Sequence, residues 1–180
     1  DENYKKWGKL YNSKGGMGYN NTLYLYLFIK ILDIDTIIES GVARGFTTFI
    51  IDNAIQDKTN LICLDVNLSN LEYKSKNAQY FESDIEDLKI KYNPKKTLVF
   101  FDDHMSHLDR LKYIKEKKIR YIVLDDDLSI FNLHSDGWPP LPTLNMIKNH
   151  LEIFSNNKIN WLFNNQKGEM SIDKVDKNEL

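Results

Sequence analysis

The sequence predicts an α/β fold in which a mostly parallel sheet is covered by helices on both faces. Short runs of apolar residues alternate along the chain with segments whose apolar residues recur at helical spacing. Runs that are apolar throughout are typical of strands that are buried on both faces. The chain has 180 residues, of which 42% are hydrophobic, and both values fit one ordinary globular domain.

The part of the chain before the first apolar run is predicted to be helical in two places. Residues 2–11 could form a short helix, and residues 13–18 then form a flexible, glycine-containing loop. Asn20 or Asn21 is expected to cap the next helix. This helix is indicated by apolar residues near helical spacing, namely Leu23, Tyr26, Leu27, Ile29 and Ile31.

The central part of the chain contains the parallel strands. Helices are predicted at about residues 46–55 and at residues 107–117. The buried strands are predicted at residues 36–39, 61–65, 78–81, 97–101 and 121–124.

The C-terminal part does not continue this alternation of strands and helices. Residues 159–163 and 169–172 flank a polar stretch that contains Lys167-Gly168, which predicts an antiparallel hairpin and brings the strand count to seven. We expect one domain over residues 1–180, with its core at residues 20–175 and an N-terminal helix and loop at residues 1–19.

Charge and cysteine content exclude several classes of protein. The formal net charge of −2 provides no overall basic field for a nucleic-acid backbone. Cys63 is the one cysteine, which excludes an internal disulfide framework and fits a reducing compartment, so we expect the cytoplasm. The apolar run at residues 23–34 is interrupted by Lys30 and is too short to span a membrane.

The turn after the first predicted strand contains two glycines, Gly41 and Gly45. In open α/β sheets a ligand binds beyond the carboxyl ends of the strands, and the first strand–helix turn is a usual place. Gly41 allows a sharp turn, and Gly45 lets the backbone approach a ligand. A dinucleotide fingerprint would need glycines where Ala43 and Phe46 stand. The alternative is a turn that only shortens the connection.

The pattern Glu39-x-Gly41-x-Ala43-x-Gly45 resembles motif I of class I S-adenosylmethionine (SAM)-dependent methyltransferases. The resemblance covers roughly residues 20–175 and implies a Rossmann-like sheet of seven strands with a C-terminal antiparallel hairpin. It also implies SAM as the cofactor, bound by these four residues. By the same resemblance Asp65 would grip the ribose hydroxyls and Asp84 would contact the adenine. The alternatives are a solvated strand end at Asp65 and a plain helix N-cap at Asp84.

Acidic residues and histidines follow the fourth and fifth predicted strands. The fourth strand leads into Asp102-Asp103-His104, with His107 three residues further on, and the fifth ends in residues 125–127, all Asp. Neighbouring parallel strands would bring both groups to one edge of the sheet. There the carboxylates repel one another unless a cation or proton neutralises them. Carboxylates suit Mg²⁺, Ca²⁺ or Mn²⁺, and an imidazole titrates near neutral pH, as a general base requires.

This second pattern is similar to that of one branch of the superfamily, the macrocin-type sugar O-methyltransferases and the cephalosporin hydroxylase-like proteins. The acids here are adjacent rather than separated by one residue, which leaves open which of them points at the site. The resemblance implies a transferase that O-methylates a sugar or another small polar acceptor. His104 and Asp103 would be catalytic, and a divalent ion would be held by Asp102, Asp103 and Asp126.

Other interpretations stay open from the sequence. One is a metal-dependent hydroxylase on the same scaffold, and another is a non-catalytic binding module. Capped helices and solvated strand ends would also explain the acidic residues. The loop at residues 131–141 either contacts the acceptor or is a surface loop anchored by Trp138. A chain of this length has little room for a segment that covers the substrate, so a partner or a homo-oligomer could supply that cover.

Overall fold

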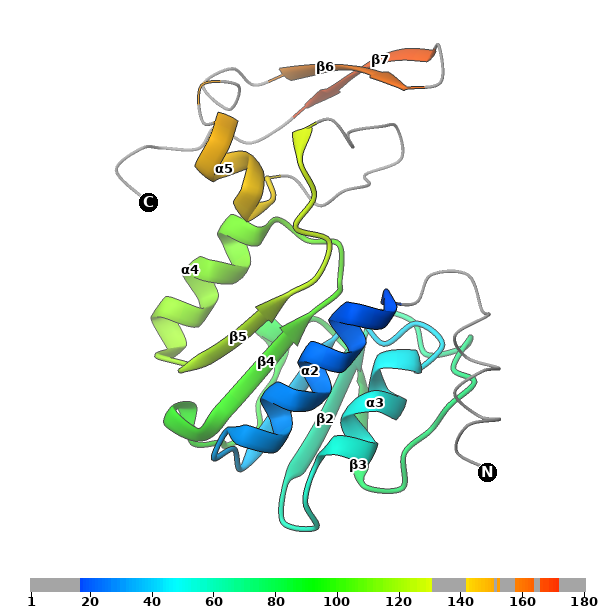
Figure 1. The fold of residues 1–180 in the computed structure, drawn as a ribbon, viewed down its shortest axis with the longest axis vertical. Helices are drawn as coiled ribbons and strands as arrows, with labels where there is room; N and C mark the ends of the chain where they lie inside the picture. The colour runs from blue at the N-terminus through cyan, green and yellow to red at the C-terminus, as the bar shows by residue number, and fades with distance from the viewer. Residues whose placement is uncertain (1–16, 131–141, 151, 153–157, 164–165, 172–180) are drawn as a thin grey trace. The chain divides into compact units, whose positions relative to one another are not determined.

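The computed structural model describes residues 17–130, 142–150, 152, 158–163 and 166–171 (Figure 1). The chain divides into two compact units. The sheet unit comprises the described residues up to Asp103 together with Ile114–Asp125, and the second unit comprises His104–Tyr113 and the described residues from Asp126 onward. The expectation of one domain over residues 1–180 stays a prediction. Within the described residues, no helix combines the length and the apolar character needed to cross a membrane.

The sheet unit contains a five-stranded sheet in the order β3-β2-β1-β4-β5, and every pairing is parallel. The sequence-predicted α/β fold with a parallel sheet is thereby confirmed. Each strand lies within one residue of its predicted bounds at either end. The strands are β1 (Thr36–Ser40), β2 (Asn60–Asp65), β3 (Ala78–Glu82), β4 (Thr97–Phe101) and β5 (Tyr121–Leu124).

The most apolar strands occupy the middle of the sheet. Every residue of β1 and β4 is buried, and β2 is buried from Leu61 to Leu64. The edge strand β3 is only partly buried, which agrees with its more polar sequence. Because β1 lies between β2 and β4, the connection that follows it starts at the point where the strand order reverses.

The helices of the chain largely agree with the sequence pattern. α3 (Phe46–Ala54) and α4 (His107–Lys117) fall where they were predicted, and α2 (Tyr19–Ile31) packs against α3. The predicted cap at Asn20 or Asn21 is wrong, because both residues lie inside the first turn of α2. The N-cap is Gly18, whose carbonyl also accepts a hydrogen bond from the Thr22 hydroxyl at 3.1 Å. Two short 3₁₀ helices, η1 (Ile85–Asp87) and η2 (Pro94–Lys96), precede β4.

The second unit contains α5 (Leu144–His150) and the strands β6 (Lys158–Phe163) and β7 (Gln166–Ser171). β6 and β7 pair antiparallel with each other in a two-stranded sheet of their own. The predicted single sheet of seven strands is therefore not confirmed, since the parallel sheet has five. A strand pattern shows that a segment is extended but not which neighbour it pairs with. The predicted helix at residues 2–11 and the loop at residues 131–141 lie outside the described residues.

Candidate functional site

The turn between β1 and α3 has a backbone conformation that requires Gly41. This residue has a φ of +92°, and a Cβ atom placed there would lie 2.1 Å from the backbone oxygen of Asp102. The backbone N–H of Gly41 donates to the carbonyl of Leu64 at 2.8 Å. The turn thus lies against the carboxyl ends of β2 and β4. Ala43, in the same turn, has a φ of +45°, a conformation that is uncommon for a residue with a side chain.

Gly45 is required for a reason that differs from the sequence prediction. Its φ is +88°, and a Cβ atom there would lie 2.4 Å from the backbone oxygen of Tyr73. The carbonyl of Arg44 accepts the N–H groups of Glu72 and Tyr73, both at 3.0 Å. The Tyr73 hydroxyl in turn donates to Asp52 on α3 at 2.5 Å. The sequence analysis predicted that a ligand approaches the backbone at Gly45. In the structure the loop after β2 fills this space. No sequence pattern predicted this contact.

Asp65, the last residue of β2, accepts hydrogen bonds from the turn between β1 and α3, which we call the glycine turn. Its Oδ2 accepts the backbone N–H groups of Val42 at 2.9 Å and Ala43 at 2.8 Å. Its Oδ1 accepts the N–H of Asn67 at 2.9 Å. A carboxylate offers about four acceptor positions, so these three bonds leave room for a further donor. The alternative of a merely solvated strand end does not describe this residue, because its carboxylate joins β2 to the turn after β1.

Glu39 lies beneath the turn and is completely buried. Its Oε2 accepts the Thr48 hydroxyl at 2.6 Å and the Cys63 thiol at 3.3 Å. Its Oε1 has no hydrogen-bond partner among the described residues. Burial raises the pKa of Glu39 from 4.5 to about 8, so the carboxyl group is mostly protonated at neutral pH. The geometry gives Glu39 a structural role that connects β1, β2 and α3, while its contact with a cofactor stays a prediction.

We expect the pKa of Glu39 to make folding stability depend on pH. The folded state binds this proton more tightly, so the contribution to stability is complete below pH 4.5 and is lost as the pH rises to about 8. The loss should approach about 1.4 kcal/mol per pH unit within this window. Glu39→Gln cannot titrate, so its stability relative to the wild type should improve as the pH rises.

Urea unfolding at the two ends of this pH window measures the effect. Glu82→Gln, at the exposed end of β3, is the matched control and should follow the wild type. Parallel pH profiles for the wild type and Glu39→Gln would show that burial does not perturb Glu39.

Asp103 points toward the end of β1. The hydroxyl of the buried Ser40 donates to its Oδ2 at 2.6 Å. The preceding Asp102 continues the sheet, since its N–H donates to the Ser40 carbonyl at 2.8 Å. The N–H of Asp125 likewise donates to the carbonyl of Phe101 at 2.9 Å, which keeps the ends of β4 and β5 adjacent. The Asp103 carboxylate therefore reaches the residue at which the turn after β1 starts.

His104 and Asp126 contact each other in the second unit. The His104 Nε2 lies 3.3 Å from the Asp126 Oδ2, and the imidazole side chain is 49% exposed. Both residues have a left-handed backbone, with φ values of +56° and +54°. Non-glycine residues in this region are strained and cluster at functional sites. The sequence had predicted both residues as part of the site without predicting their contact or their conformation.

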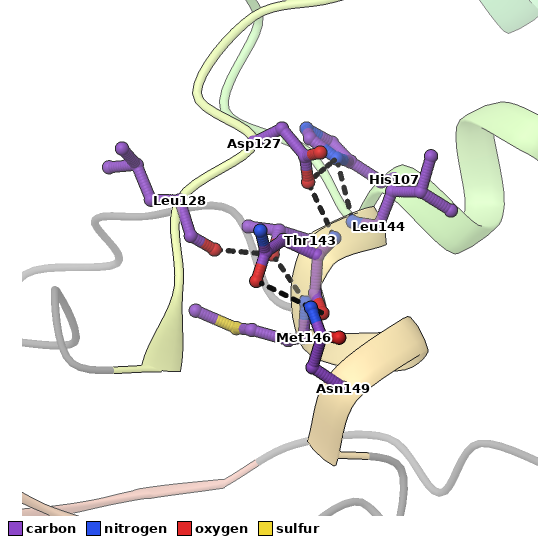
Figure 2. A network of polar contacts seen from close by, with 8 residues as sticks. His107, Asp127, Leu128, Thr143, Leu144, Met146 and Asn149 are labelled. Carbon is purple, nitrogen blue, oxygen red and sulfur yellow. Dashed lines mark hydrogen bonds and ion pairs between the residues drawn. The ribbon is translucent and has the colours of Figure 1, made fainter.

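His107 lies in a network of polar contacts around the start of α5 (Figure 2). Its ring is almost completely buried, and its Nδ1 accepts the N–H of Leu144 at 3.1 Å. Asp127 lies 3.7 Å from the same nitrogen and accepts the N–H of Asn145 at 2.6 Å. Thr143 caps α5 by accepting from Met146 and donates to the carbonyl of Leu128. His107 therefore holds the helix terminus, although its spacing from His104 suggested a shared site.

The remaining predicted residue, Asp84, lies beyond β3. Its Oδ1 accepts the N–H of Glu86 at 2.9 Å, as the N-cap of η1. This contact agrees with the helix-cap alternative, and a contact with adenine stays a prediction. Around the glycine turn, the sheet unit brings together six of the predicted residues, namely Glu39, Gly41, Ala43, Gly45, Asp65 and Asp103. A shared ion at Asp102, Asp103 and Asp126 stays a prediction.

Neither a protein-family model nor a curated protein matches the sequence. Several solved structures match the fold. The O-methyltransferase from Bacillus cereus in complex with SAH is 12% identical, with a TM-score of 0.56 over 93% of this chain and 86% of that one. TomG from Streptomyces achromogenes is an O-methyltransferase involved in tomaymycin synthesis, in complex with SAM. It is 13% identical, with a TM-score of 0.56 over 94% of this chain and 87% of TomG.

A third match is cofactor-bound Rv0187 from MTB, which is 15% identical, with a TM-score of 0.57 over 94% of this chain and 87% of that one. At these identities the likeness establishes a common fold. The predicted α/β fold with a parallel sheet agrees with this likeness.

Proposed function

We propose that the chain is a SAM-dependent methyltransferase. The observation that carries the proposal is the contact between Asp65 and the glycine turn, with N–O distances of 2.8 and 2.9 Å. This contact lies at the carboxyl ends of the central strands, next to the reversal of strand order, where open α/β sheets bind their ligands. Support comes from the two O-methyltransferases of the same fold that were solved with SAM or SAH.

The residues of the turn fit a cofactor with a hydroxylated sugar. Asp65 is only half-buried, and its carboxylate keeps an acceptor position that a ribose hydroxyl can use. In the proposal Gly41 and Ala43 present backbone to the cofactor, and Gly45 gives the turn the conformation that binds it. Asp84 contacts the adenine, and Glu39 supports the turn from within the core. When bound, SAM supplies an activated methyl group, and the task of the chain is to position the acceptor and remove its proton.

The acceptor in this proposal is a hydroxyl group of a sugar or of another small polar molecule. The His104 Nε2 lies 3.3 Å from the Asp126 Oδ2. In the proposal His104 takes the hydroxyl proton, and Asp126 stabilises the resulting imidazolium. Asp103, held by Ser40, would be the second catalytic group.

We expect His104→Ala to lose turnover and keep cofactor binding. Removal of a general base costs roughly 10²–10⁴-fold in rate. The measurement is the release of SAH from SAM with a panel of sugars as acceptors, together with the affinity for SAH. His150→Ala, at the end of α5, is the matched control and should stay active. Full activity of His104→Ala would remove His104 from the mechanism.

We further propose that Asp102, Asp103 and Asp126 hold a divalent ion. Asp102 and Asp103 directly follow β4, and Asp126 lies two residues after β5, its parallel neighbour. Carboxylate oxygens are the ligands that Mg²⁺, Ca²⁺ and Mn²⁺ prefer. The bound ion would make the acceptor hydroxyl more acidic.

Divalent ions are therefore expected to raise the melting temperature of the wild type. An ion at a hundred times its dissociation constant stabilises the folded state by about 2.7 kcal/mol. Asp103→Asn should reduce this gain, whereas Asp57→Asn, an exposed acid before β2, should not. A wild type that does not respond to any of the three ions would contradict the proposed metal site.

A further inference from the structure

The helix α2 carries an unusual concentration of exposed apolar side chains. Among the described residues, nine large hydrophobic side chains are exposed, and six of them belong to this one helix. Their exposed fractions range from 42% for Leu23 to 73% for Ile31. The six are Tyr19, Leu23, Tyr24, Leu27, Phe28 and Ile31, and we refer to them as the α2 face.

The α2 face lies opposite the side of the helix that packs into the core. Thr22, Leu25 and Ile29 are buried, and at 100° per residue they point away from Leu23 and Leu27. Apart from Asn20, Asn21 and Lys30, the helix is therefore apolar on both sides, whereas a helix at the surface of a monomer normally has one polar side. A helix that is apolar all round is expected to be covered on every side.

The size of the α2 face is sufficient for a specific interface. Six large side chains that are each about half exposed present on the order of 600 Å² of apolar area, because a fully buried aromatic side chain covers about 150–250 Å². This is at the upper end of patches on monomers, about 300–600 Å². Two such faces in contact would bury about 1,200 Å² in total, which reaches the range of specific protein interfaces.

The composition of the face distinguishes between possible occupants. A lipid surface is recognised by helices that are rich in Lys and Arg on their polar side, and Lys30 is the one basic residue of α2. Protein interfaces are instead enriched in Tyr and Phe and depleted in charge at their centre. Tyr19, Tyr24 and Phe28 give the face this character.

We propose that the α2 face binds the α2 face of a second copy of the chain in a two-fold symmetric dimer. Tyr19, Leu23, Leu27 and Ile31 are spaced four residues apart and form one ridge along the helix. Tyr24 and Phe28 form part of a second ridge. Ridges with this spacing fit into each other's grooves when two helices cross at about −50°. The surface is thus self-complementary, as a two-fold interface requires. This inference does not depend on the proposed enzymatic function.

Sedimentation of the full chain at micromolar concentrations tests the proposal. The wild type should have twice the monomer mass of 21.2 kDa. Leu27→Glu should be monomeric, because it places two charges in the centre of the interface. Val66→Glu is the matched control and should stay dimeric, since Val66 is 81% exposed and lies outside α2. Circular dichroism verifies that each variant is folded.

Oxidative cross-linking provides a second test if Leu27→Glu does not fold. Leu27→Cys should form a disulfide between two chains, whereas Val66→Cys should not. The native Cys63 is completely buried and should not interfere.

Several results would overturn the dimer. Among them are a monomeric wild type at every concentration, a Leu27→Glu variant that stays dimeric, and a wild-type monomer that associates only after deletion of residues 1–16. The last result would show that the chain's own N-terminal segment covers the α2 face. A monomer that binds vesicles of anionic lipid would assign the face to a membrane surface and would also contradict the proposal.

Discussion

Gly41→Ala is expected to lower the free energy of unfolding by about 3–5 kcal/mol, a large part of the total stability of a domain of this size. Two costs add at this position. The φ of +92° is strained for any residue with a side chain, and the new Cβ atom would lie 2.1 Å from the backbone oxygen of Asp102. Because that oxygen belongs to the backbone after β4, the clash is removed only if the carboxyl end of β4 moves.

Urea denaturation measures this effect, and Gly18→Ala provides the matched control. Gly18 has a φ of −61°, and nothing lies within 4 Å of the position of its Cβ. Because Gly18 is the N-cap of α2, where Ala is less favourable than Gly, this substitution should lower the free energy of unfolding by no more than about 1 kcal/mol. Equal urea midpoints for the two variants would show that the turn is not held against Asp102 as described.

Asp65→Ala is expected to weaken the binding of SAH by at least tenfold. Each lost hydrogen bond to a charged group is worth about 1.5–3 kcal/mol, and the turn also loses the acceptor for Val42 and Ala43. Both effects act on the same ligand site. The expectation depends on the proposed function, since SAH is the product form of the proposed cofactor.

Calorimetric titration of SAH into Asp65→Ala measures the change, and Glu82→Gln is the matched control. Glu82 pairs in register with Asp65 and accepts the N–H of Leu68 at 3.1 Å. It is a neighbouring carboxylate with a similar local contact that has no place in the proposed cofactor site. An Asp65→Ala variant that is folded and binds SAH as the wild type does would remove Asp65 from the site.

The sheet and its helices were predictable because their signals are local. The runs that form β1 and β4 are apolar throughout, and only strands in the middle of a covered sheet bury every side chain. The helix at His107–Lys117 has the bounds that the sequence predicted. That β6 and β7 form a sheet of their own could not be predicted, because an extended pattern does not specify which further strand a segment pairs with.

The candidate site was predictable in its residues but not in its contacts. Glycines at positions 41 and 45 indicated a turn with an unusual backbone conformation. No pattern in the sequence predicted that the loop after β2 packs beside Gly45. The sequence did not indicate that the Asp65 carboxylate accepts hydrogen bonds from backbone N–H groups. His107 lies three residues after His104 but is held by the start of α5, which is distant in the sequence. Contacts of this kind depend on tertiary packing rather than on local spacing.

The measurement that tests the proposed function most directly is calorimetric titration of SAM and of SAH into the wild-type chain. A SAM-dependent methyltransferase with an intact site should bind each ligand saturably, with one molecule per chain. Binding should also raise the melting temperature, because a ligand that binds only the folded state stabilises it. A folded wild type that shows neither heat of binding nor a change in melting temperature with millimolar SAM or SAH would contradict the proposal.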